Sequence, residues 1–186
     1  MVSYQWHRNG TAIPGATSTT YTLTQADVGE VITVIVAYTD GEGTPEVLVS
    51  QPTSAINDFN DPPTGQVTLS GTSAEDQILT VANDLADEDG IDGPISYQWK
   101  RDGVPISGAT LDAFTLNQDD VGSPITVTAS YTDLVGNDHT VTSSATQLVA
   151  NVNDLPLGTV GISGTPTEDQ SLTASNDLAD EDGLGT

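Results

Sequence analysis

The chain repeats itself without a gap at a spacing of 93 residues, and this repeat limits its possible folds more than any other feature. The tetrapeptide SYQW at Ser3–Trp6 returns at Ser96–Trp99, and the octapeptide NDLADEDG at Asn83–Gly90 returns at Asn176–Gly183. Solenoid units have only about 20 to 45 residues, so this period indicates independent domains arranged in tandem. Any fold predicted for one copy must therefore also suit the other.

One copy of the repeat has the pattern of short β-strands separated by turns. After Pro62, β-branched and polar residues alternate in GQVTLSG, ILTVAN, ISYQWKR, DAFTLN, PITVTASYTD and HTVTSSATQ. Asp102-Gly103, which aligns with Asn9-Gly10, is a hairpin-turn signal. About seven strands in one copy predict an all-β fold, an antiparallel β-sandwich, with no helix longer than a turn.

Aromatic residues recur at two positions of the predicted strands. Trp6 and Trp99 lie in the third strand of each copy, and Tyr38 and Tyr131 lie in the sixth. A buried aromatic residue on the third strand is typical of an Ig-like core, which need not contain a disulfide. We therefore expect these four side chains to pack in cores, with ligand stacking as the alternative.

Two linkers suggest how the chain is divided. The segments Ile56–Pro63 and Val149–Pro156 are polar, contain proline, and lie between a last and a first predicted strand. We therefore expect residues 1–61 to form a repeat from its third strand to its last. Residues 62–154 are expected to form a complete Ig-like repeat, and residues 155–186 the first two strands of another.

Together, residues 1–61 and 155–186 supply one full copy of the repeat, divided in the acidic loop between its second and third strands. Unpaired strand edges pair readily with other strands. One hypothesis is therefore that the C-terminal segment of one molecule completes the N-terminal segment of another, giving head-to-tail oligomers by strand complementation. The alternative is that both segments remain separate and frayed.

The charge of the chain excludes several classes of partner. It has 27 acidic and 3 basic residues and a formal net charge of −24. Nucleic acid and anionic membrane surfaces are therefore excluded as expected partners, because both bind through basic residues. Such charge destabilises a compact state unless cations neutralise it, which favours divalent cations as ligands. Disorder of the whole chain is the alternative that this composition leaves open.

Cysteine and long apolar segments are absent from the sequence. Disulfides and thiolate metal sites are therefore excluded. No run approaches the roughly 18 apolar residues of a membrane span, and no signal-peptide pattern opens the sequence, so we expect no insertion into a membrane.

The acidic loops are candidate calcium sites. The octapeptide places carboxylates next to Gly90, which allows a sharp turn, and calcium takes six to eight oxygen ligands. The EDQ turn is expected to lie near a linker carboxylate or near the loop of the neighbouring domain; a merely solvated acidic face is the alternative. The candidate ligands are Asp61, Glu75, Asp76, Asp84, Asp87 and Asp89 and, in the next copy, Asp154, Glu168, Asp169, Asp177, Asp180 and Asp182.

The sequence resembles a known class of bacterial repeats. The segment VNDLP followed by GTPTEDQSLTASNDLADEDG resembles the cadherin-like and Ig-like tandem repeats of large secreted RTX-type adhesins. The segments ISYQWKRDGVPISGAT and TLNQDDVGSPITVTASYTD are similar to the bacterial Ig-like module of the same proteins. The resemblance covers essentially the whole chain.

This resemblance implies a calcium-stiffened stalk at the cell surface, outside the cell, with neighbouring identical repeats as partners. It also implies calcium ligands in the two linkers, namely Asn60, Asp61, Asn153 and Asp154. The chain lacks the full linker motif of animal cadherins. It also lacks the glycine-rich nonapeptides of RTX proteins, so the resemblance implies a stalk and not a secretion signal.

Nothing in the sequence predicts catalysis. The two histidines, His7 and His139, align with Lys100 and Glu46, so neither is repeated. No nucleophile elbow, zinc-protease helix motif or phosphate-binding loop is present. We therefore expect a non-catalytic extender of an adhesin. A carbohydrate- or protein-binding β-sandwich and a self-assembling split repeat are the alternatives.

Overall fold

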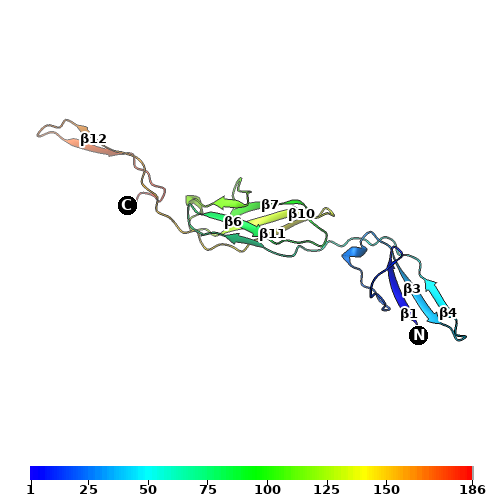
Figure 1. Cartoon of the computed structure of the whole chain (residues 1–186). Coiled ribbons are helices and arrows are strands. Elements are labelled where there is room, and N and C mark those ends of the chain that lie inside the picture. Colours follow the sequence, from blue (N-terminus) through cyan, green and yellow to red (C-terminus); the bar gives the residue numbers. More distant parts are fainter. Residues whose placement is uncertain (186) are drawn as a thin grey trace. The chain divides into compact units, whose positions relative to one another are not determined.

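A computed structural model describes residues 1–185 as β-strands joined by turns (Figure 1). Its strands are β1 (Ser3–Arg8), β2 (Thr11–Ala12), β3 (Ile32–Thr39), β4 (Pro45–Val49), β5 (Val67–Ser70), β6 (Ile78–Asn83), β7 (Asp92–Arg101), β8 (Val104–Pro105), β9 (Ala113–Thr115), β10 (Ile125–Thr132), β11 (Asp138–Thr142), β12 (Val160–Gly164) and β13 (Leu172–Asn176). Two single-turn 3₁₀ helices are η1 (Gln25–Asp27) and η2 (Gln118–Asp120), and the described residues contain no α-helix. The all-β prediction is therefore confirmed.

The chain divides into two compact units. The first unit contains Met1–Pro62 and the short segment Asp87–Gly90, and the second contains Pro63–Ala86 and the chain from Ile91 onward. The division into residues 1–61, 62–154 and 155–186 remains a prediction.

The second unit contains two antiparallel sheets and a separate hairpin. One sheet has the strand order β5-β6-β9, and the other has the order β11-β10-β7-β8. Seven strands, β5 to β11, therefore lie within residues 62–154, the number that the alternating pattern predicts. Both sheets contribute to one hydrophobic core, as expected for a β-sandwich. The core residues are Val67, Leu79, Trp99, Leu116, Ile125, Val127, Ala129 and Val149.

Trp99 lies in the centre of this core. Its side chain is completely buried, and its indole Nε1 donates a hydrogen bond of 2.8 Å to the carbonyl oxygen of Leu111. Its ring stacks on Phe114 with 5.5 Å between the ring centroids. Tyr131 is also buried and stacks on His139. A buried indole whose N–H is satisfied stabilises a core without a polar penalty.

The first unit has a single sheet, with the order β2-β1-β3-β4. Trp6 aligns with Trp99 and makes the same bond to a backbone carbonyl, here that of Ser18 at 2.9 Å, yet its side chain is only half-buried. Tyr38 is 36% exposed, so the expectation of a core position is not met there. The physical reason is that, among the residues that the structure describes, this unit has no counterpart of β5 and β6 to cover the sheet.

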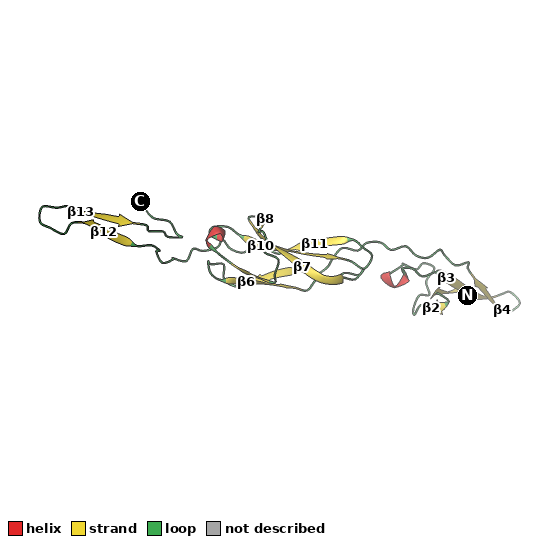
Figure 2. Ribbon diagram, turned by 90° about the horizontal axis from the view of Figure 1, so that it is seen from above, coloured by secondary structure: helices red, strands yellow, loops and turns green. Residues whose placement is uncertain are grey.

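The strands β12 and β13 form a two-stranded antiparallel sheet by themselves (Figure 2). They align with β5 and β6, but their apolar side chains are exposed. Val160 is 70% exposed and Leu172 is 55% exposed, whereas the aligned Val67 and Leu79 are 4% and 1% exposed. Identical residues at aligned strand positions therefore have two different environments in one chain.

Local sequence explains the tight turns. Asn9 and Gly10 have φ angles of 45° and 78°, and Asp102 and Gly103 have φ angles of 49° and 78°. Two successive residues with positive φ form the hairpin turn that Asn-Gly and Asp-Gly favour. The hairpin prediction is confirmed at both positions, where β1 pairs with β2 and β7 pairs with β8.

The helical turn η2 is fixed by polar contacts. Asn117 accepts a hydrogen bond from the amide of Asp119, and the buried Asp120 accepts one from the amide of Asn117. Arg101 pairs with Asp120 at 2.7 Å, so the buried carboxylate is neutralised. This turn begins at Gln118, which borders the acidic cluster described below.

Candidate metal centre

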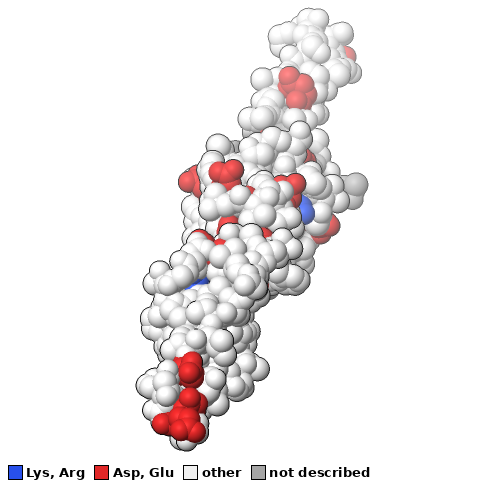
Figure 3. Space-filling view, turned by 90° about the vertical axis from the view of Figure 1, so that its right-hand side faces the viewer, with Lys and Arg blue, Asp and Glu red and all other residues white. Residues whose placement is uncertain are grey.

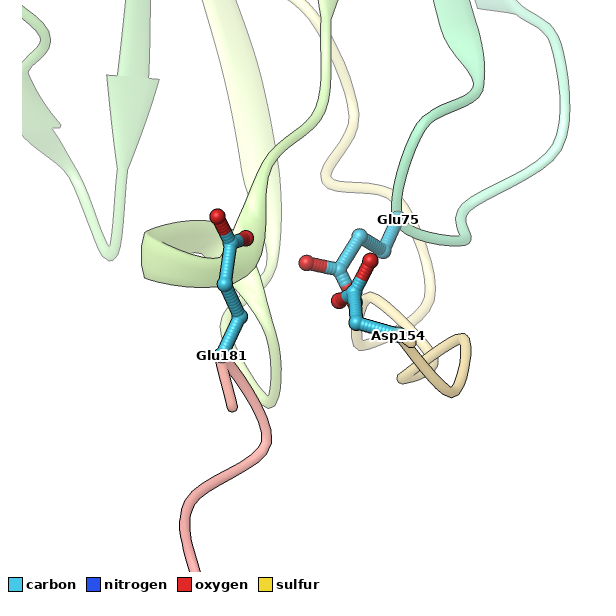
Figure 4. Close-up of side chains that lie close together, drawn as sticks. All are labelled: Glu75, Asp154 and Glu181. Atoms are coloured by element: carbon cyan, nitrogen blue, oxygen red, sulfur yellow. The ribbon is translucent and has the colours of Figure 1, made fainter. Parts of the chain in front are cut away.

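Three carboxylates from distant parts of the second unit meet in one place (Figure 4). Glu75 lies in the turn between β5 and β6, Asp154 lies in the linker before β12, and Glu181 lies in the octapeptide after β13. One oxygen of each lies within 4.8 Å of the others. Glu75 and Asp154 point toward each other, and Glu181 faces them from the opposite side.

Backbone pairing holds the turn of Glu75 against the end of the sandwich. The amide of Glu75 donates to the carbonyl oxygen of Ala150 at 2.9 Å, and the amide of Ala150 donates to the carbonyl oxygen of Ser73 at the same distance. The position of the Glu75 side chain therefore follows from the fold and not from a flexible loop.

The octapeptide is tied to the linker by Asp182. Its carboxylate accepts a hydrogen bond of 2.9 Å from the amide of Asp154 and one of 2.6 Å from the side chain of Asn151. Asp180 in turn accepts a bond from the amide of Asp182 at 3.0 Å. These contacts bring Glu181 to the cluster, while the carboxylates of Asp180 and Asp182 bind backbone and amide groups.

Glu75 is an unusual glutamate because it is only 2% exposed. It accepts hydrogen bonds from the amide of Val152 at 3.2 Å and, in the amide orientation that satisfies both partners, from Gln118 at 2.7 and 3.0 Å. Burial raises the pKa of Glu75, the Val152 amide opposes this, and the charges of Asp154 and Asp76 raise the pKa further. The ionised site is therefore unfavourable without a cation.

Asp154 provides a second sign that a ligand belongs here. Its oxygen Oδ2 is buried and has no hydrogen-bond partner among the described residues. Burial raises the pKa of Asp154, and the neighbouring Asp182 and Asp76 raise it further. Buried polar atoms are nearly always satisfied, so an unpaired carboxylate oxygen that faces two further carboxylates fits a bound cation.

Acidic side chains far outnumber basic ones on the face that Figure 3 shows. The two arginines are paired elsewhere, Arg8 with Asp27 at 2.8 Å and Arg101 with Asp120 at 2.7 Å. All donor atoms of the cluster are carboxylate oxygens, which suit a hard divalent cation such as calcium or magnesium. The cluster could therefore hold a metal ion, whose identity these atoms alone do not determine.

Two predicted ligands of the first unit, Asp61 and Asp89, lie together without forming such a cluster. Asp89 is buried and accepts hydrogen bonds from the amide of Asp61 at 2.7 Å and from Gln25 at 3.0 Å. Asp87 accepts a bond from the amide of Asp89 at 2.9 Å. Backbone and amide donors thus supply the positive partners for these carboxylates. Within residues 1–185, the only group of three mutually close acidic residues is the one that contains Glu75.

Asp84 and Asp177 do not belong to the cluster, and their carboxylates instead accept hydrogen bonds from the backbone. Asp84 accepts a hydrogen bond of 2.6 Å from the amide of Gln66, and Asp177 accepts one of 2.5 Å from the amide of Thr159. Both therefore close the ends of their strand pairs. The bonds from Thr159 lower the pKa of Asp177 despite some desolvation, as expected for a carboxylate that accepts backbone N–H groups.

The remaining predicted ligands lie on the surface of the described structure. Asp76 and Asp169 have positive φ angles, 60° and 66°, and so form the turns of their hairpins. Five predicted ligands are exposed and do not belong to the cluster, namely Asn60, Asp76, Asn153, Glu168 and Asp169. Of all the predicted ligands, Glu75 and Asp154 are thus the two that belong to the cluster of three carboxylates.

Glu181 was missed by the sequence prediction. The octapeptide has three consecutive acidic residues, Asp180, Glu181 and Asp182, and the prediction selects Asp180 and Asp182 because they lie two residues apart next to Gly183. Since Asp180 and Asp182 bind amides, the residue between them faces the other way. Recognising that Asp180 and Asp182 accept hydrogen bonds from backbone amides would have indicated Glu181, the residue between them, as the ligand.

No known protein-family model matches the chain, and no curated protein is significantly similar to it. The described residues contain no helix of the length and hydrophobicity that crossing a membrane requires. The function must therefore be inferred from the fold and from the acidic cluster.

Proposed function

We propose that the chain forms calcium-stabilised extender repeats of a bacterial cell-surface adhesin, without catalytic activity. In this proposal, the second unit is an Ig-like or cadherin-like β-sandwich outside the cell, followed by the start of the next tandem repeat. Calcium binds where one repeat meets the next and stiffens the stalk.

The cluster of Glu75, Asp154 and Glu181 is the observation that supports this proposal. Its members come from the sandwich, the linker and the following repeat, so a cation among them ties three segments together. Calcium is preferred to magnesium in the proposal because its coordination is larger and more flexible, and three carboxylates from independent segments suit that flexibility.

Cation binding has a direct energetic consequence. Without an ion, burial and mutual repulsion disfavour the ionised carboxylates, as the raised pKa values of Glu75 and Asp154 indicate. A cation that binds only the folded state stabilises it by mass action. Extracellular calcium modules bind at about 10⁻⁴ to 10⁻³ M, so millimolar calcium is the appropriate test concentration.

The test is thermal unfolding of the Trp6→Phe variant, in which Trp99 of the second unit is the sole tryptophan reporter. Fluorescence is followed in EDTA, in 10 mM magnesium and in 10 mM calcium. We expect calcium to raise the midpoint by on the order of 10 °C, with a smaller effect of magnesium. Glu75→Gln in the same background should abolish most of the calcium effect.

The control is Glu46→Gln, which makes the same change of charge at an exposed position on β4. It should leave the calcium effect unchanged. Identical midpoints in all three solutions would refute the calcium proposal. The second unit would then be a plain β-sandwich spacer whose acidic residues are only solvated.

A further inference from the structure

The first unit exposes a face that the second unit buries. Leu116, in the second unit, is completely buried, whereas the aligned Leu23 of the first unit is 47% exposed. The same holds for Val127, which is buried, and the aligned Val34, which is only half-buried. The aligned residues are identical but differ in burial, because β5 and β6 cover the sheet of the second unit, whereas no strand within residues 1–185 covers the sheet of the first.

Backbone groups of the first unit also lack the pairing found in the second. In the second unit, β9 pairs with β6 through Leu79 and Phe114, and the amide of Leu116 donates to the carbonyl oxygen of Gln77 at 2.9 Å. The segment that aligns with β9 is Thr20–Thr22, and it belongs to no strand. An extended segment beside an uncovered sheet is a ready acceptor for strand addition.

The hairpin β12–β13 offers the missing strands. It is paired in the same register as β5 and β6, since Val160 lies opposite Asn176 as Val67 lies opposite Asn83. Its apolar side chains Val160 and Leu172 are exposed, whereas the aligned Val67 and Leu79 of β5 and β6 face the core of the second unit. The second unit thus shows how two strands of this register pack on a similar sheet.

We propose that the hairpin β12–β13 of one copy of the chain docks on the uncovered sheet of the first unit of a second copy. Leu172 then lies opposite Tyr21, as Leu79 lies opposite Phe114, and Thr20–Thr22 becomes a strand beside β13. A second copy of this chain is the occupant because its hairpin has the register of β5 and β6 and carries Val160 and Leu172 where these strands carry the buried Val67 and Leu79.

The proposed interface joins two different surfaces of the chain. Such a heterologous contact leaves one free hairpin and one free sheet at the ends of every oligomer, so it produces head-to-tail chains. Because each copy carries a net charge of −24, association is expected to be weak at low salt and stronger when salt screens the charges.

The test is sedimentation velocity of the whole chain over a range of concentrations, in EDTA and about 150 mM salt, where surface charges are screened. We expect the mass to rise with concentration beyond that of a monomer. Leu172→Asp places a charge on the docking face of the hairpin. Because Leu172 is exposed in the monomer, the variant should still fold. It should weaken association by at least about 10- to 100-fold, the factor that burying one leucine supplies.

The matched control is Thr173→Asp, which adds the same charge to the next residue, on the opposite face of β13. It should associate as the parent chain does. A sharper test mixes Leu172→Asp, which retains the acceptor sheet, with Leu23→Asp, which retains the hairpin. Each alone should be monomeric, and the mixture should form a one-to-one dimer that does not extend further.

A monomeric mass of the parent chain at all concentrations overturns the proposal, as does equal association of Leu172→Asp and Thr173→Asp. Because these measurements contain EDTA, they do not depend on calcium binding. The docking and the calcium proposal can therefore fail independently.

Discussion

At the scale of single residues, the most highly connected carboxylate is Asp133, in the turn between β10 and β11. It is buried, and its Oδ1 accepts hydrogen bonds from the amides of Val135, Gly136 and Asn137 at 2.6 to 2.9 Å. Its Oδ2 lies 3.2 Å from Nε2 of His139. Burial would raise the pKa of Asp133, but the bonds from Asn137, His139 and Gly136 outweigh it and hold this pKa well below its ordinary value.

Asp133→Asn should therefore destabilise the second unit in a pH-dependent manner. A lowered pKa in the folded state means that the unfolded state binds more protons, so the carboxylate adds stability above its ordinary pKa of 3.8. This contribution is lost as the pH falls below that value. Urea unfolding should show a clear loss for the variant at pH 7 and a much smaller loss near pH 2.5.

Asp40→Asn is the natural comparison, since Asp40 aligns with Asp133 in the turn after β3. Asp40 accepts bonds from only two amides, those of Glu42 and Thr44, and is less buried. The first unit should lose less stability from this change. A loss for Asp133→Asn that is independent of pH would show that the charge of Asp133 does not matter.

The residue scale also shows how far the sequence predicts the candidate site. Glu75 and Asp154 were predicted because an acidic turn and an acidic linker recur at the same end of a sandwich. Asp84 was predicted as a ligand, but it closes the strand pair of Gln66. Composition cannot separate these cases, because backbone amides and cations both satisfy a carboxylate, and only the fold decides which is near.

At the scale of elements, hairpins of similar sequence differ in energy because their surroundings differ. Leu79 on β6 is buried in a shared core, and Leu172 on β13 is exposed to solvent. Alternation of apolar residues predicted the strands β5 and β6, since it depends only on the local pattern, and the repeat extended this prediction to residues 155–186. It could not predict burial, which depends on whether a second sheet is present.

The pair Leu79→Ala and Leu172→Ala separates these two environments. The first change should cost the second unit about 3 kcal/mol, because it removes a transfer contribution and leaves a cavity. The second change should leave unfolding of dilute protein within about 0.5 kcal/mol, as is usual for exposed positions. Chemical unfolding monitored by Trp99 fluorescence measures both.

The same pair has a second expected difference. At concentrations where the parent chain associates, Leu172→Ala should weaken association, because Leu172 is proposed to be buried there. If Leu172→Ala destabilises the dilute chain as strongly as Leu79→Ala does, Leu172 is buried in the monomer and the hairpin β12–β13 is not exposed.

At the scale of the whole molecule, the two proposals become linked. Glu168 aligns with Glu75, Asp61 with Asp154, and Glu88 with Glu181, at the same spacing of 93 residues. If a hairpin docks as proposed, Glu168 of one copy approaches the acceptor unit that contains Asp61 and Glu88 of the other. The docked pair then has the three carboxylates of the candidate metal centre.

Calcium should therefore strengthen the association of copies, provided that both proposals hold. Sedimentation in 10 mM calcium should show larger oligomers than sedimentation in EDTA at equal protein concentration and ionic strength. Glu168→Gln should reduce the calcium effect, and the distant Glu46→Gln should retain it. Association that is equal with and without calcium would remove the link while leaving the docking itself intact.

The similarity of the two hairpins also affects how reliably the chain folds. The hairpin β12–β13 competes with β5–β6 for the same sheet of the second unit, so an exchanged, misassembled species is a hazard when the chains fold in each other's presence. The strands differ at five of the ten aligned positions of β5 and β6, and at one of these Val81, which packs against the core, aligns with the smaller Ala174. The intruding hairpin therefore leaves a void at this position where the resident one fills space. Such differences give the resident strands an advantage over the similar strands of another repeat.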